Sequence, residues 1–247
     1  MSPINKTTVP KVAVVLPAYN AAETLKQTVG DIPSDIVDDI ILVDDCSNDQ
    51  TAELAKSLGI FVYEHKFNLG YGGNQKTCYS IALERDADII IMLHPDYQYD
   101  ARLISYFVGL IRDKYFDVVL GSRIRSRKET LEGGMPLYKY IANRGLSIFE
   151  NILSGQNLSE WHTGMRAYSR EVLESIKFKD FSNDFVFDSQ ALFKIVENGF
   201  KIGEIPVPVR YFQEASSINF KRSVQYGLGT VGIAISYFLR NLFNKNA

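Results

Sequence analysis

The sequence is poor in cysteine and has no excess of charge of either sign. Cys46 and Cys78 are the only cysteines among its 247 residues, and their spacing matches neither a disulfide framework nor a zinc site. A protein of a reducing compartment is therefore expected. Lysine and arginine number 27 against 29 aspartates and glutamates, so no global charge attracts the chain to nucleic acid, and any anion site must be local.

Long hydrophobic segments are also lacking. The first residues, MSPINKTTVPK, contain no apolar core of a signal peptide, which indicates a cytoplasmic protein. The longest apolar run, residues 228–239, has about 12 residues and two glycines, whereas a helix needs roughly 20 apolar residues to cross a bilayer. The sequence therefore predicts no membrane-spanning helix.

Two glycine-rich nucleotide signatures are missing. The segment PAYNAAETL follows the first expected strand without a glycine, so the close pyrophosphate approach of a dinucleotide-binding G-x-G-x-x-G loop is excluded. Residues 70–77 end in Lys76 and Thr77 as a P-loop does, but Gln75 stands where that loop requires glycine. These observations argue against a dehydrogenase and against a kinase or ATPase.

The chain does contain an alternation of strand and helix patterns. With 46% hydrophobic residues, it is long enough for one large α/β domain. The expected strands are residues 12–16, 40–43, 61–64, 89–93, 117–121, 166–168 and a proline-interrupted edge strand over 201–211; the expected helices are residues 21–29, 51–58, 75–84, 138–153, 170–175 and 189–198. This order predicts a doubly wound, mostly parallel, Rossmann-like sheet with helices on both faces.

Polar side chains follow the expected strand 89–93. If the extended backbone continues through Pro95, His94 and Asp96 project to the same side at the carboxyl end of the strand. Ligands bind at that edge of open α/β sheets. Together with Gln98, these side chains supply the nitrogen and oxygen donors that hold a divalent cation and, through it, a diphosphate. The alternative is a polar loop that only closes the strand.

A second polar cluster ends the strand 40–43. Asp44 and Asp45 lie where a carboxylate can accept the imide N–H of uracil or guanine, and either can instead cap the next helix. Pro17 and Tyr19 end the neighbouring strand, where the tyrosine can stack on a base or simply pack. The sequence thus predicts a nucleotide site between these two strands.

Seven motifs resemble the family 2 glycosyltransferases of the GT-A fold, and most closely the dolichol-phosphate mannosyltransferase-like branch. The resemblance covers residues 11–220. The motifs are LPAYN at 16–20, VDDCSNDQT at 43–51, NLGYGGN at 68–74, HPDYQ at 94–98, GSR at 121–123, TGMRAYSREVL at 163–173 and GFKIGEIPVPVRY at 199–211.

The resemblance implies a role for each matching residue. By that resemblance, the base and ribose of a nucleoside diphosphate sugar are held by Pro17, Tyr19, Val43 and Asp45, Mg²⁺ or Mn²⁺ by Asp96 and Gln98, the acceptor phosphate by Arg123 and Arg144, and the donor diphosphate by Arg210. Three positions depart from the family pattern. His94 replaces the first aspartate of the metal motif, Ala21 a glutamate, and Glu160 an aspartate.

The expected function is inverting transfer of a hexose from a GDP- or UDP-sugar to a polyprenyl or dolichyl phosphate at the cytoplasmic face of the membrane. A phosphate nucleophile is already ionised and needs no base. Transfer to a sugar hydroxyl in glycan or glycolipid assembly is an alternative and requires a base; its candidates are Glu160, His162, Asp184 and Asp188. A third reading is a sugar-nucleotide-binding subunit with little activity.

Three regions are expected along the chain. Residues 1–10 form an N-terminal extension, residues 11–220 the GT-A domain, and residues 221–247 an apolar helical tail. The tail either packs on the domain or on a second subunit, or lies in the membrane interface with its basic ends near lipid headgroups. The basic run RIRSRK at 123–128 either meets an anionic acceptor or forms a solvated loop.

Overall fold

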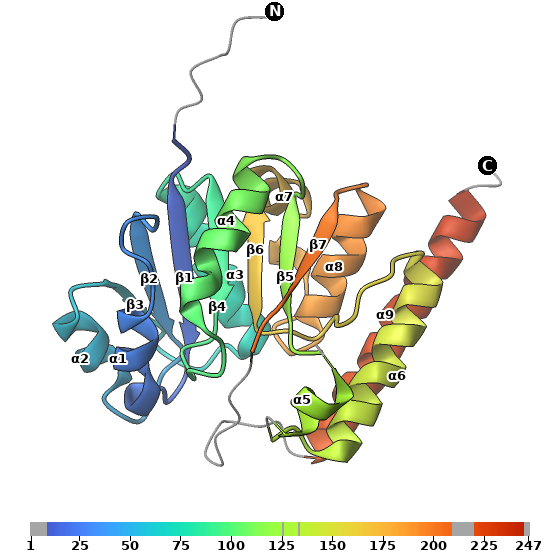
Figure 1. Cartoon of the computed structure of the whole chain (residues 1–247), viewed down its shortest axis with the longest axis horizontal. Helices are drawn as coiled ribbons and strands as arrows, with labels where there is room; N and C mark the ends of the chain where they lie inside the picture. Colours follow the sequence, from blue (N-terminus) through green and yellow to red (C-terminus); the bar gives the residue numbers. More distant parts are fainter. Residues whose placement is uncertain (1–8, 125, 133, 209–219, 245–247) are drawn as a thin grey trace, which may run out of the picture.

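A seven-stranded sheet forms the centre of the molecule (Figure 1). The computed structural model describes residues 9–124, 126–132, 134–208 and 220–244. The strands are β1 (Val12–Ala18), β2 (Asp39–Asp44), β3 (Phe61–Glu64), β4 (Ile89–Leu93), β5 (Val118–Ser122), β6 (Met165–Ser169) and β7 (Ile202–Pro206), in the order β3-β2-β1-β4-β6-β5-β7. All neighbours are parallel except β6, which is antiparallel to β4 and β5. The mostly parallel sheet expected from the sequence is therefore confirmed.

Helices cover both faces of the sheet. The α-helices are α1 (Ala22–Gly30), α2 (Thr51–Ser57), α3 (Tyr71–Glu84), α4 (Ile104–Arg112), α5 (Arg127–Glu132), α6 (Leu137–Ser154), α7 (Arg170–Ser175), α8 (Phe187–Glu197) and α9 (Phe220–Asn244), with short 3₁₀ turns at Ala101–Leu103 and Phe178–Asp180. Alternate residues of β1 belong to two separate cores. One core includes α3, α7 and α8, and the other includes α1, α2 and α4, as a doubly wound fold requires.

The sheet reverses its winding direction between β1 and β4. From β1 the chain adds β2 and β3 on one side, and β4 then pairs with the other edge of β1. In such sheets the crevice at this switch point is the usual ligand site. LPAYN ends β1 and begins the loop after it, and HPDYQ follows β4, so two of the expected site motifs lie at this crevice.

Three elements differ from the sequence-based expectation. Helix α3 begins at Tyr71 instead of residue 75, so the glycine-rich segment supplies its first turn. Helix α4 was not predicted, although Ile104, Phe107, Val108 and Ile111 have helical spacing and are all buried. Helix α5 is short, and Arg127 and Lys128 in its first turn are exposed.

The expected apolar tail is one continuous helix, α9, beside α6 (Figure 1). Its glycines do not break it. A Cβ on Gly229 would lie 2.6 Å from Val186 Cγ1, so this glycine permits close packing on the domain. The Tyr237 ring lies 4.9 Å from that of Phe193, and one face of α9 therefore contributes to the core. Among the residues described, no helix is both long and apolar enough to cross a membrane.

Candidate functional site

The ends of β1 and β2 bring the predicted base-binding residues together. Pro17 pairs with Val43 in the sheet. Asn74 of α3 donates from Nδ2 to the carbonyl oxygens of Ala18 and Val43, at 3.2 and 3.0 Å, and holds both strand ends. Tyr19, just beyond β1, is 49% exposed. Its ring is therefore accessible for stacking.

The two aspartates after β2 have different partners. Asp44 accepts hydrogen bonds from the amide of Ser47 at 3.0 Å and from its hydroxyl at 2.5 Å, and so closes a local turn. Asp45 accepts from the amides of Leu69 at 2.8 Å and Gly70 at 3.0 Å, and its Oδ1 lies 2.7 Å from His65 Nδ1. Two of these contacts are made by Oδ1 and one by Oδ2. The Oδ2 atom of Asp45 can therefore accept a second hydrogen bond. Neither aspartate caps α2.

The glycine-rich segment packs backbone against backbone and is not a phosphate loop. The amides of Gly72 and Gly73 donate to the Asn183 carbonyl at 2.8 and 3.2 Å. A Cβ on Gly72 would lie 2.4 Å from the Ser182 carbonyl oxygen. Lys76 donates to Asn183 Oδ1 at 2.9 Å. The lysine is thus used within the protein, which agrees with the exclusion of a P-loop.

The segment after β4 turns sharply. The expectation that the extended backbone continues through Pro95 is wrong, because β4 ends at Leu93 and Tyr97 has a φ of 57°. Asp96 Oδ1 accepts the Gln98 amide at 3.1 Å and stabilises the turn. The turn keeps Asp96 near enough to interact electrostatically with His94, and Gln98 follows in the same loop after β4.

His94 is wedged between an aromatic ring and a glycine. Its Nε2 lies 3.2 Å from the Tyr71 hydroxyl, and a Cβ on Gly164 would lie 2.2 Å from its Cδ2. Tyr71 also donates to Asp188 Oδ2 at 2.8 Å, and Asp188 pairs with the buried Arg166 at 2.8 Å. Burial lowers the pKa of His94. Burial and the Asp188 carboxylate raise the pKa of Tyr71 well above its ordinary value, so its hydroxyl remains protonated.

The donors after β4 fit a cation that is shared with a diphosphate. No group of three histidine, cysteine or acidic side chains able to hold a metal occurs in the described part of the chain. The predicted ligands would supply two such side chains, His94 and Asp96, and an amide oxygen from Gln98. In the same part of the chain, Asp96 Oδ2 has no hydrogen-bond partner. A cation that keeps several ligands from water and phosphate matches this small donor set.

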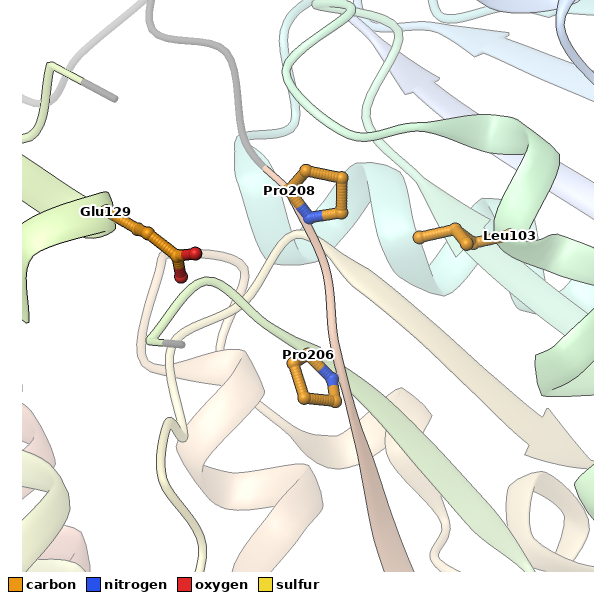
Figure 2. A pocket seen from close by; sticks show the side chains of 4 residues that line it. All are labelled: Leu103, Glu129, Pro206 and Pro208. Carbon is orange, nitrogen blue, oxygen red and sulfur yellow. The ribbon is translucent and has the colours of Figure 1, made fainter. Parts of the chain in front are cut away.

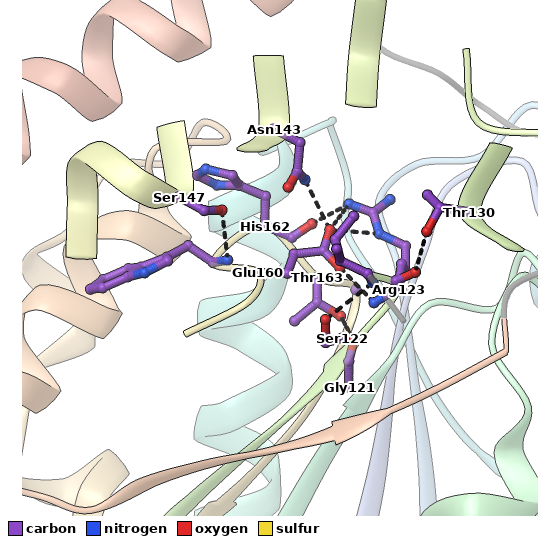
Figure 3. Close-up of polar contacts among 12 residues, drawn as sticks. Gly121, Ser122, Arg123, Thr130, Asn143, Ser147, Glu160, His162 and Thr163 are labelled. Atoms are coloured by element: carbon purple, nitrogen blue, oxygen red, sulfur yellow. Dashed lines mark hydrogen bonds and ion pairs between the residues drawn. The ribbon is translucent and has the colours of Figure 1, made fainter. Parts of the chain in front are cut away.

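Arg123 and Glu160 form a tight pair at the end of β5 (Figure 3). Glu160 is fully buried and accepts the Arg123 amide at 2.6 Å and its Nε at 2.8 Å, and Asn143 Nδ2 at 2.9 Å. Arg123 also donates to the His162 carbonyl at 2.5 Å. The departure from aspartate at position 160 thus supplies the longer side chain that reaches Arg123.

Arg144 reaches the same loop from α6. Its Nη1 donates to the Ser159 carbonyl at 2.5 Å. A cavity of about 490 Å³ beside this contact is lined by Arg144, Ile148, Asn151, Ile152, Gln156, Asn157, Leu158, Ser159 and Glu204. Both predicted acceptor arginines therefore contact the loop 159–162. Arg144 also borders a cavity whose mainly polar lining includes Ile148, Ile152 and Leu158.

Three of the four candidate bases are engaged with other side chains. Glu160 is paired with Arg123, and Asp188 with Arg166. His162 lies between Glu150 and Tyr226, with its ring nitrogens 3.0 Å from Glu150 Oε2 and 2.5 Å from the tyrosine hydroxyl. The fourth, Asp184, is exposed and accepts the Phe185 amide at 2.8 Å.

A second cavity, of about 560 Å³, lies beyond β7 (Figure 2). It is lined by Leu103, Glu129, Pro206 and Pro208 and by none of the predicted site residues. Arg210, predicted for the donor diphosphate, is outside the described residues.

Sequence reasoning missed the residues behind His94. Tyr71 and Gly164 lie within quoted motifs, but no local pattern shows that both touch His94, because the contacts join segments far apart in the chain. The partner of Arg166 could not be predicted either. An arginine in a buried strand must have an acidic or polar partner, but the sequence does not show that this partner is Asp188.

Comparison with known proteins agrees with these motifs. The model of Glycosyl transferase family 2 matches residues 13–177. The chain is 29% identical to the UDP-N-acetylglucosamine–dolichyl-phosphate N-acetylglucosaminyltransferase of Methanococcus voltae, over 80% of this chain and 85% of that protein. It is 30% identical to the dolichyl-phosphate hexose transferase of Haloferax volcanii, over 80% of this chain and 82% of that protein.

Solved structures show the same fold. Glucosyl-3-phosphoglycerate synthase from Mycobacterium tuberculosis, in complex with Mn²⁺, uridine diphosphate and phosphoglyceric acid, superposes with a TM-score of 0.70 at 17% identity. The match covers 93% of this chain and 78% of that chain.

Proposed function

The chain belongs to glycosyl transferase family 2 and has the GT-A fold, and we propose that it moves a hexose from a GDP- or UDP-sugar to a polyprenyl or dolichyl phosphate. Glycosyl transfer is common to the family. The proposal that the acceptor is a polyprenyl or dolichyl phosphate rests on the surroundings of Arg144.

Arg144 lies in the middle of an apolar stripe on α6. The stripe consists of Leu137, Ile141, Ile148 and Ile152, which are 50% to 72% exposed. These residues and Arg144 follow one another at intervals of three or four, so they share one face of the helix. A cation within an exposed apolar stripe matches a ligand that carries both a phosphate and a hydrocarbon chain. This observation carries the proposal.

Three of the four candidate bases are engaged with other side chains, and this favours a phosphate acceptor. A sugar hydroxyl needs a base to remove its proton, whereas a phosphate oxygen is already charged near neutral pH. Glu160 and Asp188 each hold an arginine, and His162 contacts Glu150 and Tyr226. Arg123 and Arg144 would then orient the acceptor phosphate by charge-assisted hydrogen bonds.

The donor would bind at the crevice between β1 and β4. Tyr19 would stack on the base, with Pro17 and Val43 beneath it, and Asp45 Oδ2 would accept the imide N–H that uracil and guanine share. His94, Asp96 and Gln98 would hold Mg²⁺ or Mn²⁺. When bound, the cation neutralises the charge that develops on the departing diphosphate. Arg210 stays a predicted diphosphate ligand.

The relatives support a lipid-phosphate acceptor. The proteins from Methanococcus voltae and Haloferax volcanii are both named for dolichyl phosphate, and a 25% identical relative from Micrococcus luteus is named undecaprenyl-phosphate mannosyltransferase. Their donors differ by name, which leaves the nucleotide and the hexose of this chain to experiment.

Helices α6 and α9 would place the site at the cytoplasmic membrane surface. In addition to the α6 stripe, α9 exposes Val224, Leu228, Ile235, Phe238, Leu239, Leu242 and Phe243. Within the two helices the only acidic residue is Glu150, which is buried, whereas Arg240 is exposed. Apolar side chains with basic and no acidic neighbours suit the interface of an anionic bilayer. The apolar faces are alternatively a contact between two copies of the chain.

Acceptor competition tests the proposal. The full chain is incubated with each of a set of GDP- and UDP-hexoses, Mn²⁺ or Mg²⁺, and either a polyprenyl phosphate or the matching polyprenol, and the products are identified by mass spectrometry. We expect a hexose on the phosphate and none on the alcohol. Transfer to glycan hydroxyls alone would replace this proposal by the hydroxyl alternative. Donor binding without transfer to any acceptor would indicate a binding subunit.

A further inference from the structure

A chain of polar side chains leads from His94 into the interior through Tyr71, Asp188 and Arg166. Behind the imidazole ring lies Tyr71, which stacks on Phe185 with ring centroids 4.8 Å apart. Asp188, beyond Tyr71, accepts from Gln75 Nε2 at 3.1 Å and pairs with Arg166. Tyr71 comes from α3, Arg166 from β6 and Asp188 from α8, and the Tyr71 hydroxyl links this group to the imidazole Nε2.

The hydrogen bonds determine where the imidazole proton lies. The Tyr71 hydroxyl has one hydrogen, which it donates to Asp188 at 2.8 Å. Asp188 cannot donate in return, because a carboxylate paired with a guanidinium only accepts. The tyrosine oxygen therefore presents a lone pair to His94 Nε2, 3.2 Å away, and Nε2 must carry a hydrogen. In a neutral imidazole the other nitrogen, Nδ1, is then bare.

The bare nitrogen has no protein partner among the described residues, and it is not one of the buried polar atoms that lack a hydrogen bond. It therefore reaches solvent. Gly164 lies against Cδ2, the ring carbon next to Nε2, and so closes the same edge of the ring as Tyr71. Asp96 is near enough to interact electrostatically with the ring. The ring is thus held with one nitrogen buried and the other open at the carboxyl edge of the sheet.

We propose that Tyr71, anchored by Asp188 and Arg166, is a positioning residue that fixes His94 in its Nε2-protonated tautomer and presents Nδ1 as a ligand for the cation. That the bound group is a cation rests on the proposed function. The tautomer of His94 follows from the hydrogen bonds alone. An imidazole nitrogen in place of a carboxylate oxygen disfavours Mg²⁺, which prefers oxygen ligands. The site therefore binds Mn²⁺ in preference to Mg²⁺.

Histidine NMR tests the tautomer without any metal. The chain has three histidines, so the ¹⁵N-histidine-labelled full chain gives three ring patterns, and His94→Gln identifies one of them. We expect His94 to show the Nε2-protonated pattern. In Tyr71→Phe the ring stacking remains and only the hydroxyl is lost, so the signals should move toward an average of both tautomers.

Tyr79→Phe is the matched control. Tyr79 lies on the same helix and its buried hydroxyl donates to Gln75 Oε1 at 2.7 Å, without touching His94. This variant should leave the His94 signals unchanged. An Nδ1-protonated His94 in the wild-type chain, or an unchanged pattern in Tyr71→Phe, would overturn the proposal.

Metal titration tests the consequence. Free Mn²⁺ is measured by electron paramagnetic resonance in the presence of UDP or GDP, with Mg²⁺ as competitor. We expect Tyr71→Phe to weaken Mn²⁺ binding by about 10- to 100-fold, as loss of a partner of a metal-binding histidine generally does, and Tyr79→Phe to leave it unchanged. His94→Asp should reduce the preference for Mn²⁺ over Mg²⁺.

The ligand role of His94 and the proposed hexose transfer can be refuted separately. If the wild-type chain binds Mn²⁺ no more tightly than His94→Gln while it still transfers hexose, the ligand role of His94 is wrong and the proposed function stands. If no sugar nucleotide is bound or consumed, the proposed function is wrong, and the role of Tyr71 is decided by the NMR pattern alone.

Discussion

Replacing Gly164 by alanine should displace His94. The added Cβ would lie 2.2 Å from His94 Cδ2 and 3.0 Å from Tyr99 Cε2. Since carbon atoms in contact are normally about 3.5–4.0 Å apart, the ring has to move by more than about 1 Å. The Tyr71 ring also packs against His94, with ring centroids 5.5 Å apart, and restricts the directions in which the imidazole can move.

The expected magnitude follows from this overlap. Overpacking in a closed site costs about 1–3 kcal/mol, which for a chain of this size lowers the Tm by roughly 2–12 °C. A 1 Å displacement of a group in the site lowers the transfer rate by up to about 100-fold. Calorimetric unfolding and initial transfer rates measure the two effects.

Gly145→Ala is the matched control. Gly145 lies within α6, and a Cβ there meets nothing within 4 Å. Alanine should stabilise the helix by up to about 1 kcal/mol. If Gly164→Ala unfolds at the wild-type temperature with unchanged activity, His94 is not held by this contact and the reasoning is refuted.

Three further predictions concern the acceptor, the metal and the thiols. Arg144→Ala should raise the acceptor KM about 10- to 100-fold, through loss of a charge-assisted hydrogen bond, and leave calorimetric donor affinity unchanged. Lys26→Ala, exposed on α1, is the control, and an equal loss of donor affinity would contradict the assignment. Asp96→Ala should lower transfer at least about 100-fold with a Tm close to wild type, whereas full activity in EDTA would exclude the metal role. In the folded chain the exposed thiol of Cys46 should react with a maleimide, whereas the thiol of Cys78 should not, because Cys78 is buried and burial raises its pKa. Rapid labelling of both cysteines without denaturant would contradict this.

Arg123→Ala is a poorer test of acceptor binding than Arg144→Ala. Arg123 is the main partner of Glu160, whose side chain is fully buried. Removing one member of a buried pair costs about 3–5 kcal/mol, because the remaining charge loses its compensation. A loss of transfer in this variant would therefore mix acceptor binding with disorder of the loop 159–162.

The strands could be predicted because their signals are local. Apolar runs such as Ile89–Leu93 form strands in the middle of the sheet and are buried on both faces. The family and the GT-A fold could be predicted because seven short motifs occur in order, and the match to the family 2 model and to solved structures confirms both. The antiparallel orientation of β6 was not visible, since strand direction depends on how the chain returns to the sheet between β4 and β5.

The sequence by itself determined which chemical groups stand at the strand ends: the carboxylates after β2, the His-x-Asp segment after β4, and the arginines of GSR and α6. Only the tertiary structure decided which of them are committed to protein partners. Tyr71 meets Asp188 across 117 residues, and Arg123 meets Glu160 across 37 residues. The physical reason is that residue type and spacing fix local geometry, whereas the partner of a buried charge is set by how distant helices and loops pack around it.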